Sequence, residues 1–376
     1  MKVGIISMQR VCNNGSFLQA YGLKKLIESL GHEVVFIDYH VGTPIMQSSK
    51  DRVAFWKLKV RNVFIYLFTN CKSLRTLLPG DMKNVAVKRD EYKHIVLPLI
   101  GISDKRHYNT QVDALVIGSD EVFNCTQINP EVGFSPELFG YKANAKKVMS
   151  YAASFGNTTY KKLQDCNKVD ELKGYFEKFT SISVRDNNSF LVIRALTGKE
   201  PKINLDPVLM YDFMSTVPDK EKRSDYIVVY AYRSRITDKE EEVIKAFAKS
   251  QGKKLISVSG EMSWCDEHFK GNPFEVLDLF RHADYAITDT FHGTIFSVIN
   301  RIKFVTLIRN SMGGVYGNQE KLQDLLDKLY LQERSYSIDT DDFESRMLAS
   351  IDYDRTFNVI IEERKHTMDY LKDNLK

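Results

Sequence analysis

The sequence contains few cysteines, and they lie far apart. There are five, an odd number, with no CxxC pair and no histidine at a metal-ligand spacing from any of them. Their positions are Cys12, Cys71, Cys125, Cys166 and Cys265. This pattern disfavours both a disulfide framework and a zinc site, and it indicates a reducing, cytoplasmic environment.

Long apolar and long basic runs are also absent. No window holds the roughly 18 consecutive apolar residues of a membrane-spanning helix, and the apolar stretch in Met1–Met8 is too short for a signal peptide. The net charge is only +4 over 376 residues, without the cluster of Lys and Arg that indicates nucleic-acid binding. We therefore expect an intracellular protein that binds anionic ligands at a few local sites and binds no nucleic acid.

Strand and helix patterns alternate through the chain. Val3–Met8 reads as a buried strand, a helix follows from Ser16, and a second strand at residues 34–38 completes a βαβ unit. The alternation stops in the polar, proline-containing stretch 215–224 and resumes at Tyr226. At roughly 100–200 residues per domain, this predicts two doubly wound α/β domains.

We place the domain boundary in that polar stretch. The prediction is a first domain over residues 1–218, a second over 219–350, and a C-terminal helix over 351–376 that could pack back on the first domain. Sheets of this class bind ligands outside the carboxyl ends of their strands. Two such domains facing each other would form a cleft.

Residues 51–80 interrupt the alternation with a segment rich in aromatic and basic side chains. It contains Phe55, Trp56, Phe64, Tyr66 and Phe68 together with Arg52, Lys57, Lys59, Arg61, Lys72 and Arg75. A basic, amphipathic helix of this kind can make a peripheral contact with an anionic membrane surface. The simpler alternative is an insertion packed on its domain by the aromatic side.

The segment Thr288–Gly293 places polar residues and a glycine where a strand gives way to a helix. Backbone N–H groups at a helix start, together with the positive end of the helix dipole, form an anion site. Histidine exchanges protons near neutral pH, so His292 is a candidate proton donor to a phosphorylated ligand. The alternative is that Asp289 or Thr290 caps the helix and His292 bonds a backbone group.

Two further strand-end loops carry charged side chains. Arg185 has the side chain best matched to phosphate or carboxylate, although it could equally pair with Asp186. Asp120, in the loop Gly118–Asn124, is a candidate general base or acceptor contact, with a turn cap as the alternative. Arg309 and Lys321 are further candidates for anion binding, or else solvated surface residues.

Six of these loops, in order, resemble motifs of the polysaccharide pyruvyl transferase family across nearly the whole chain. Asn13–Tyr21 is similar to the family's N-Y-G-A-x-L-Q-A-Y, Gly118–Asn124 to G-S-D-Q-V-W-N, and Thr288–Gly293 to T-D-S-F-H-G. The other three are Ser150–Gly156, Ser183–Asp186 (S-V-R-E in the family) and Leu205–Leu209.

The resemblance implies two Rossmann-like domains facing across a cleft, as in GT-B glycosyltransferases. It also implies a transferase of polysaccharide (exopolysaccharide) biosynthesis that moves a pyruvyl group from phosphoenolpyruvate to a glycan or lipid-linked sugar, in the cytoplasm or at the inner face of the membrane. His292 would be the general acid or a phosphate ligand, Asp120 an acceptor contact or the base, and Arg185 and Arg309 anion clamps. No cofactor or metal is implied. The remaining candidate substrate-binding residues are Lys321, Thr290, Gly293, Asn14, Gly15, Ser119 and Asn124.

The chain departs from the family pattern at several of these positions. Glu121 and Phe123 replace Gln and Trp, Asn14 replaces an aromatic residue, and all three are expected to line the acceptor side. Thr290 and Lys321 stand where relatives carry Arg, which changes the expected set of anion-binding charges. Two alternative functions remain: a GT-B-type glycosyltransferase that uses a nucleotide sugar, and a two-lobed binding protein without catalysis.

Overall fold

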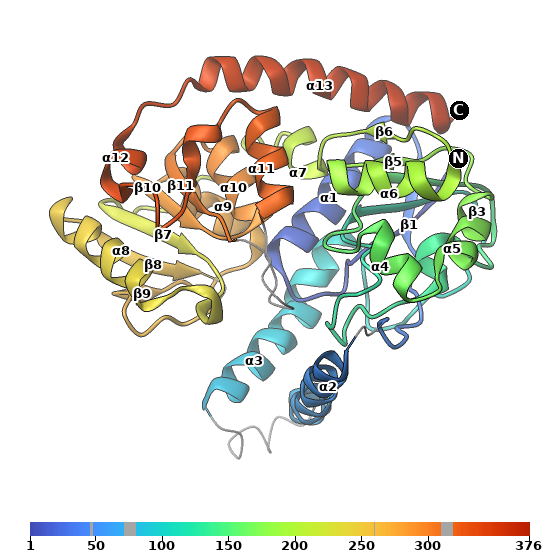
Figure 1. Cartoon of the computed structure of the whole chain (residues 1–376), viewed down its shortest axis with the longest axis horizontal. Helices are drawn as coiled ribbons and strands as arrows, with labels where there is room; N and C mark the ends of the chain where they lie inside the picture. Colours follow the sequence, from blue (N-terminus) through green and yellow to red (C-terminus); the bar gives the residue numbers. More distant parts are fainter. Residues whose placement is uncertain (46–47, 71–79, 259, 310–318) are drawn as a thin grey trace. The chain divides into compact units, whose positions relative to one another are not determined.

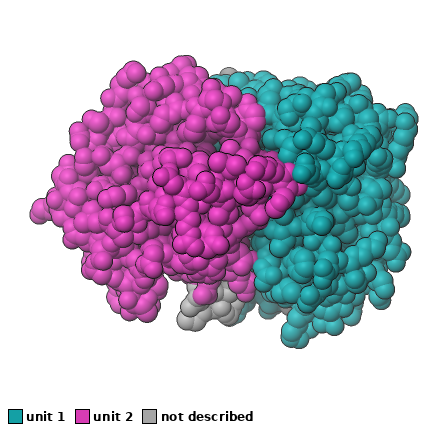
Figure 2. Space-filling model, turned by 90° about the horizontal axis from the view of Figure 1, so that it is seen from above, with its two compact units in different colours: residues 1–207, 367–376 teal, residues 208–366 magenta. Residues whose placement is uncertain are grey.

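The computed structural model describes residues 1–45, 48–70, 80–258, 260–309 and 319–376. The chain forms two compact units, which Figure 2 shows in different colours. The first contains residues 1–207 and 367–376, and the second contains residues 208–366. Cys71 and the part of the predicted 51–80 insertion between residues 71 and 79 lie outside the described residues.

The first unit is built on a six-stranded parallel sheet with the order β2-β1-β3-β4-β5-β6 (Figure 1). Its central strands β1, β3 and β4 are buried over most of their length, because helices cover both faces of a parallel sheet. The strands are β1 (Lys2–Ile6), β2 (Glu33–Phe36), β3 (Val112–Asp120), β4 (Ala145–Ala153), β5 (Ser183–Val184) and β6 (Lys202–Ile203).

The helices of the first unit connect these strands in the usual crossover manner. They are α1 (Asn14–Ser29), α2 (Ser49–Asn70), α3 (Gly80–Glu91), α4 (Tyr160–Asp165), α5 (Val169–Phe176) and α6 (Asn187–Thr197). Helices α4 and α5 are separated where Asn167 adopts a left-handed backbone conformation with φ of 53°. Asparagine tolerates that conformation better than most residues.

The core of the first unit contains a cluster of phenylalanines. The Phe123 ring, which is fully buried, lies 5.1 Å from that of Phe139, 5.3 Å from Phe155 and 5.2 Å from Phe176, measured between ring centroids. Aromatic pairs at such distances stabilise a core beyond the area they bury. The prediction that Phe123 lines the acceptor side is therefore wrong, since its side chain points into the core.

The second unit has its own six-stranded parallel sheet, with the order β12-β11-β10-β7-β8-β9 (Figure 1). Read from the opposite edge, this is the 3-2-1-4-5-6 order of a Rossmann fold. The strands are β7 (Tyr226–Tyr230), β8 (Lys254–Val258), β9 (Glu267–His268), β10 (Tyr285–Thr288), β11 (Lys303–Leu307) and β12 (Ser335–Tyr336). The predicted fold class, two doubly wound α/β domains, is confirmed.

Short and long helices complete the second unit. They are α8 (Asp238–Ser250), α9 (Pro273–Arg281), α10 (Phe291–Ile299), α11 (Gln319–Lys328) and α12 (Phe343–Leu348), while α7 (Pro207–Met210) leads from the first unit into the second. The C-terminal helix α13 (Tyr353–Asn374) belongs to the second unit up to His366 and to the first unit from Thr367. No helix within the described ranges is both long and apolar enough to cross a membrane.

The division between the units comes earlier than the boundary we placed after residue 218. Residues 208–218 belong to the second unit, where helix α9 bonds part of this segment and the residues just after it. Arg281 donates hydrogen bonds to the carbonyl oxygens of Met214 and Val217, and the Asp278 carboxylate accepts from the backbone N–H groups of Lys220 and Glu221. The backbone of this polar stretch is therefore hydrogen-bonded to α9, and the stretch is not a free linker.

Because Phe123 is central to the aromatic cluster, we expect Phe123→Ala to lower the free energy of unfolding of the first unit by about 3–5 kcal/mol. Urea denaturation followed by circular dichroism measures this loss. Leu191→Ala is the matched control, since Leu191 is exposed on α6 and its truncation should cost less than about 1 kcal/mol. An equally small loss for Phe123→Ala would contradict the packing described above.

Candidate functional site

In the first unit, polar side chains gather where the sheet changes the direction of its strand order. The chain runs from β1 outward to β2 and then returns to β3 on the other side of β1, so β1 and β3 form the topological switch point. Open α/β sheets bind ligands outside the carboxyl ends of the strands at such a point. Asp120 ends β3, and Ser16 lies in the first turn of α1, which follows β1.

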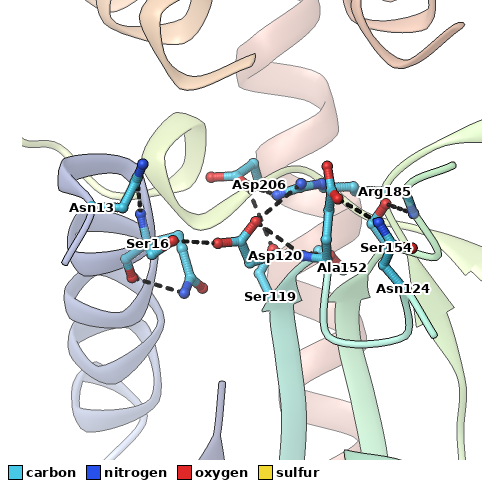
Figure 3. Close-up of polar contacts among 12 residues, drawn as sticks. Asn13, Ser16, Ser119, Asp120, Asn124, Ala152, Ser154, Arg185 and Asp206 are labelled. Atoms are coloured by element: carbon cyan, nitrogen blue, oxygen red, sulfur yellow. Dashed lines mark hydrogen bonds and ion pairs between the residues drawn. The ribbon is translucent and has the colours of Figure 1, made fainter. Parts of the chain in front are cut away.

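Asp120 is held on both carboxylate oxygens. Ser16 Oγ donates to Oδ2 at 2.7 Å, while the Glu121 backbone N–H donates to Oδ1 at 2.9 Å. Figure 3 shows this carboxylate between the Ser16 hydroxyl and the guanidinium of Arg185. The backbone of Asp120 has a φ of 74°, a conformation that costs on the order of 1–3 kcal/mol for a residue with a side chain. The surrounding hydrogen bonds hold it there.

Arg185, which follows β5, joins two carboxylates from different parts of the chain. Its terminal nitrogens lie 3.3 Å from Asp120 Oδ1 and 2.9 Å from Asp206 Oδ2, and its side chain is only 3% exposed. Burial opposes the charged form, but Asp120 and Asp206 outweigh burial and hold the pKa of Arg185 above its usual range. To clamp a ligand anion, the guanidinium would have to exchange one of these carboxylates for it.

The remaining candidates of the first unit lie around this ion-pair network. Asn14 and Gly15 are buried in the first turn of α1, whose N-cap is the Asn13 side chain. Ser119 Oγ donates to the carbonyl oxygen of Ala152 at 2.9 Å. Asn124 Nδ2 donates to the Glu121 carboxylate at 2.8 Å. These contacts orient the loops at the carboxyl edge of the sheet.

The second unit has a corresponding switch point between β7 and β10, and the segment Thr288–Gly293 lies there. Thr290 is the N-cap of α10, and its Oγ1 accepts a hydrogen bond from the Gly293 N–H at 2.9 Å. Thr288 Oγ1 donates to the carbonyl oxygen of Tyr230, at the end of β7. A Cβ on Gly293 would lie 2.1 Å from Thr288 Oγ1, so glycine is required for this tight turn.

His292 lies in the first turn of α10 and is nearly buried. Its ring meets that of Phe291 edge to face, with 5.6 Å between centroids, and lies 6.2 Å from that of Phe296. The backbone N–H groups at the start of α10 and the positive end of its dipole are in the same turn. The structure thus places His292 at the type of helix start at which anions bind.

Charged side chains from three strand ends surround this helix start. Asp289, after β10, is fully buried and accepts from the Tyr232 N–H, and its carboxylate lies 3.5 Å from Arg235. Arg309, after β11, donates to the Arg235 carbonyl oxygen and to Glu240, both at 3.0 Å. Burial raises the pKa of Asp289, while the charges of Arg235 and Arg309 partly offset this effect.

Several members of these clusters were not among our sequence-based candidates. They are Arg235, Glu240, Ser16 and Asp206. Lys321 was a sequence-based candidate, and it lies in the first turn of α11, a helix that packs beside α10. Arg235 follows the buried apolar strand β7, so the rule that located Arg185 also applied to it. Glu240 belongs to the capping box Thr237–Glu240, a readable helix-start signature.

Comparison with known proteins adds a family assignment. The sequence pattern of the family described as "Polysaccharide pyruvyl transferase" matches residues 13–311. No curated protein sequence matches the chain at a significant level.

Among solved structures, S. aureus MnaA bound to UDP aligns over 98% of this chain and 90% of that chain, with 9% identity and a TM-score of 0.47. The Methanocaldococcus jannaschii UDP-GlcNAc 2-epimerase in complex with UDP-GlcNAc and UDP aligns over 92% and 98%, with 12% identity and a TM-score of 0.39. The Streptomyces sp. SF2575 glycosyltransferase SsfS6, complexed with thymidine diphosphate, aligns over 99% and 98%, with 10% identity and a TM-score of 0.42. With TM-scores below 0.5, these likenesses indicate nothing about the ligand of this chain.

Removing Arg185 should destabilise the first unit, because it leaves two buried carboxylates without their shared counter-charge. We expect Arg185→Met to lower the free energy of unfolding by about 3–5 kcal/mol. Arg185→Met combined with Asp206→Asn should recover part of that loss, as a double-mutant cycle in urea would measure. Arg194→Met, an exposed arginine on α6, is the control and should change stability by less than about 0.5 kcal/mol. Strictly additive losses would refute the coupling.

Proposed function

This chain belongs to the polysaccharide pyruvyl transferase family, and on that premise we propose that it transfers the pyruvyl group of phosphoenolpyruvate to two hydroxyls of a sugar, forming a ketal. The observation that carries the proposal is the position of His292, in the first turn of α10 at the switch point of the second unit. This turn combines a group able to give up a proton with backbone donors suited to an anion.

Phosphoenolpyruvate is a compact anion with a phosphate and a carboxylate, so its site needs fixed positive charge. Thr290 stands where some relatives carry Arg, and in this chain it caps α10 instead. Arg235 supplies a charge beside the same turn, since it contacts Asp289, the residue before Thr290. Its side chain is 28% exposed, so the guanidinium can also reach a ligand at the surface. Arg309 follows the neighbouring strand and adds a second guanidinium.

The chemistry begins with a proton transfer to the substrate. Protonated His292 gives its proton to the methylene carbon of phosphoenolpyruvate, which becomes a methyl group and leaves an oxocarbenium-like centre at the neighbouring carbon. One sugar hydroxyl attacks that centre and loses its proton. Phosphate then leaves and takes up that proton, and a second hydroxyl of the same sugar forms the other C–O bond while its proton restores protonated His292. The balance is one phosphoenolpyruvate and one diol converted to one ketal and one inorganic phosphate.

The first unit offers the groups suited to a sugar acceptor. Asp120 lies at the switch point, and its carboxylate already accepts a hydrogen bond from the Ser16 hydroxyl. An acceptor hydroxyl that replaced the Ser16 hydroxyl would find the same carboxylate as its proton acceptor. Arg185 then acts as the positioning residue that fixes Asp120.

A second candidate function is transfer of a sugar from a nucleotide sugar. The observation that favours it is the strand order of the second unit, which is that of Rossmann nucleotide-binding folds. Phosphoenolpyruvate and nucleoside diphosphates are tested side by side in thermal unfolding. Stabilisation by phosphoenolpyruvate supports the pyruvyl transferase, whereas stabilisation by a nucleoside diphosphate alone supports the glycosyltransferase.

We expect the protein to release inorganic phosphate from phosphoenolpyruvate when a suitable glycan acceptor is present. His292→Gln should lower kcat by about 10²–10⁴-fold, since the proton donor is lost while the side chain remains polar and similar in volume. A colorimetric phosphate assay over a panel of glycans and lipid-linked sugars measures the phosphate released by the parent protein and the kcat of the variant.

His282→Gln is the matched control for this substitution. His282 ends α9 in the same unit, and its Nε2 bonds Asp219 at 2.8 Å. The His282→Gln variant should release phosphate at the parent rate, and both variants should keep the parent melting temperature. Full activity in His292→Gln would overturn the role given to His292.

We also propose that catalysis needs no metal, because Arg235 and Arg309 supply fixed positive charge near α10. Within the described residues, one group of side chains has metal-ligand geometry: Asp219, Asp278 and His282. The Asp278 oxygens in that group already accept bonds from backbone N–H groups and from Arg281. Phosphate release should therefore be unchanged after treatment with EDTA, and a loss restored by Mg²⁺ would disprove metal independence.

A further inference from the structure

Helix α2 carries two apolar stripes on opposite sides. One stripe faces α3, where Phe55 and Ile65 are buried and Asn62 accepts a hydrogen bond from Arg89. At 100° per residue, the positions Val53, Trp56, Val60, Val63 and Leu67 fall together on the other side of the helix. These five side chains, with Phe64 beside them, form what we call the outer face of α2.

The outer face is uncovered. Each of its six side chains is more than half exposed, from 52% at Val60 to 57% at Leu67, and Tyr66 next to it is 66% exposed. Isolated exposed apolar residues are ordinary, but a contiguous apolar face of this length indicates a binding surface. The sequence-based alternative, an insertion packed by its aromatic side, therefore describes only the α3-facing stripe.

Basic side chains border the outer face on both sides. Arg52 and Lys59 lie along one border, and Lys57 and Arg61 along the other, and all four are exposed. No described carboxylate lies within ion-pairing distance of any of them. The single acidic residue of α2, Asp51, is on the α3-facing side, where it pairs with the Ser48 backbone and hydroxyl at the helix start.

We propose that the outer face of α2 binds an anionic lipid surface. The helix would lie in the plane of the interface, with its apolar side chains among the acyl chains and its Lys and Arg side chains at the headgroups. Trp56 fits this placement because indole rings favour the boundary between hydrocarbon and water. Neither the apolar stripe nor the charge pattern is needed to fold the α2–α3 hairpin, which has its own small core around Ile65 and Ala86.

A second copy of the chain is a less suitable partner for this face. The three-four spacing from Val53 to Leu67 does match the seam of a coiled coil. Two such helices, however, would bring Arg52, Lys57 and Lys59 of one copy against the same residues of the other, with no acidic residue to pair them. The charge pattern therefore favours an anionic surface over self-association.

The test is sedimentation of the purified protein with vesicles. Vesicles of phosphatidylglycerol and phosphatidylcholine in equal amounts should bind the protein at least about tenfold more tightly than vesicles of phosphatidylcholine alone, and high salt should weaken binding. K57E/K59E/R61E should lower the affinity at least about tenfold. Trp56→Ser with Leu67→Ser should lower it as well, even at low salt.

A matched control separates this surface from general electrostatics. K178E/K199E/K202E makes the same change in net charge on exposed lysines elsewhere in the first unit and should bind vesicles like the parent protein. The substituted side chains are exposed in every variant, so far-ultraviolet circular dichroism should be unchanged. Equal loss in both charge variants, or no preference of the parent for anionic vesicles, would overturn the proposal.

A spectroscopic measurement reports on the helix itself. The chain has only two tryptophans, and Trp264→Phe leaves Trp56 as the sole emitter. Its fluorescence should shift to shorter wavelength when anionic vesicles are added and should be quenched by brominated lipid. A concentration-dependent shift without vesicles would instead indicate self-association and refute the lipid surface. Vesicle binding does not depend on the reaction proposed above, so either proposal can fail alone.

Discussion

The arrangement of the first unit depends on Arg185 holding two carboxylates at the carboxyl edge of a parallel sheet. Asp120 and Asp206 are nearly buried and come from different strand ends. Two charges in such a setting are each costly to desolvate, and their removal from water is tolerated only when a counter-charge and further hydrogen bonds satisfy them. Arg185 provides the charge, and Ser16 and the Glu121 N–H provide bonds to Asp120. The strained backbone of Asp120 persists because these partners fix its side chain.

The polar cluster of the second unit contains less buried charge than the Arg185 network of the first unit. Around α10 the polar groups are mainly hydroxyls and backbone N–H groups, and Thr288 and Thr290 bond each other and the backbone. Gly293 lets the chain turn tightly enough for these bonds. Asp289 is the exception: burial raises its pKa, and the charges of Arg235, at 3.5 Å, and Arg309 offset only part of this effect. The Arg235 side chain, which is 28% exposed, is therefore paired less closely with its carboxylate than the buried Arg185 is with Asp206.

Much of the fold and several of the candidate site residues could be predicted from the sequence, because apolar runs of strand length end at identifiable polar residues. That rule located Asp120, Arg185, Thr290 and His292, and the alternation of patterns gave the fold class. It missed Asp206, because the preceding strand β6 has only two residues, both exposed, and leaves no apolar signal. It misplaced Phe123, because a loop motif does not show which of its side chains turns inward. The boundary between the two units was placed too late in the chain, because amino-acid composition does not show that α9 forms hydrogen bonds to the polar segment.

Helix α2 shows a different limit of sequence patterns. Its apolar residues lie all round the helix in the sequence, so a single amphipathic face cannot be recognised from spacing alone. The structure separates them into a stripe covered by α3 and a stripe whose residues are more than half exposed. Only after that separation do the flanking Lys and Arg become informative, because their positions can then be compared with the uncovered face. Apolar residues without the charges would suit any hydrophobic partner, and the charges without the apolar face would suit any anion. Their combination on one side of one helix favours a surface that offers both, and an anionic bilayer does.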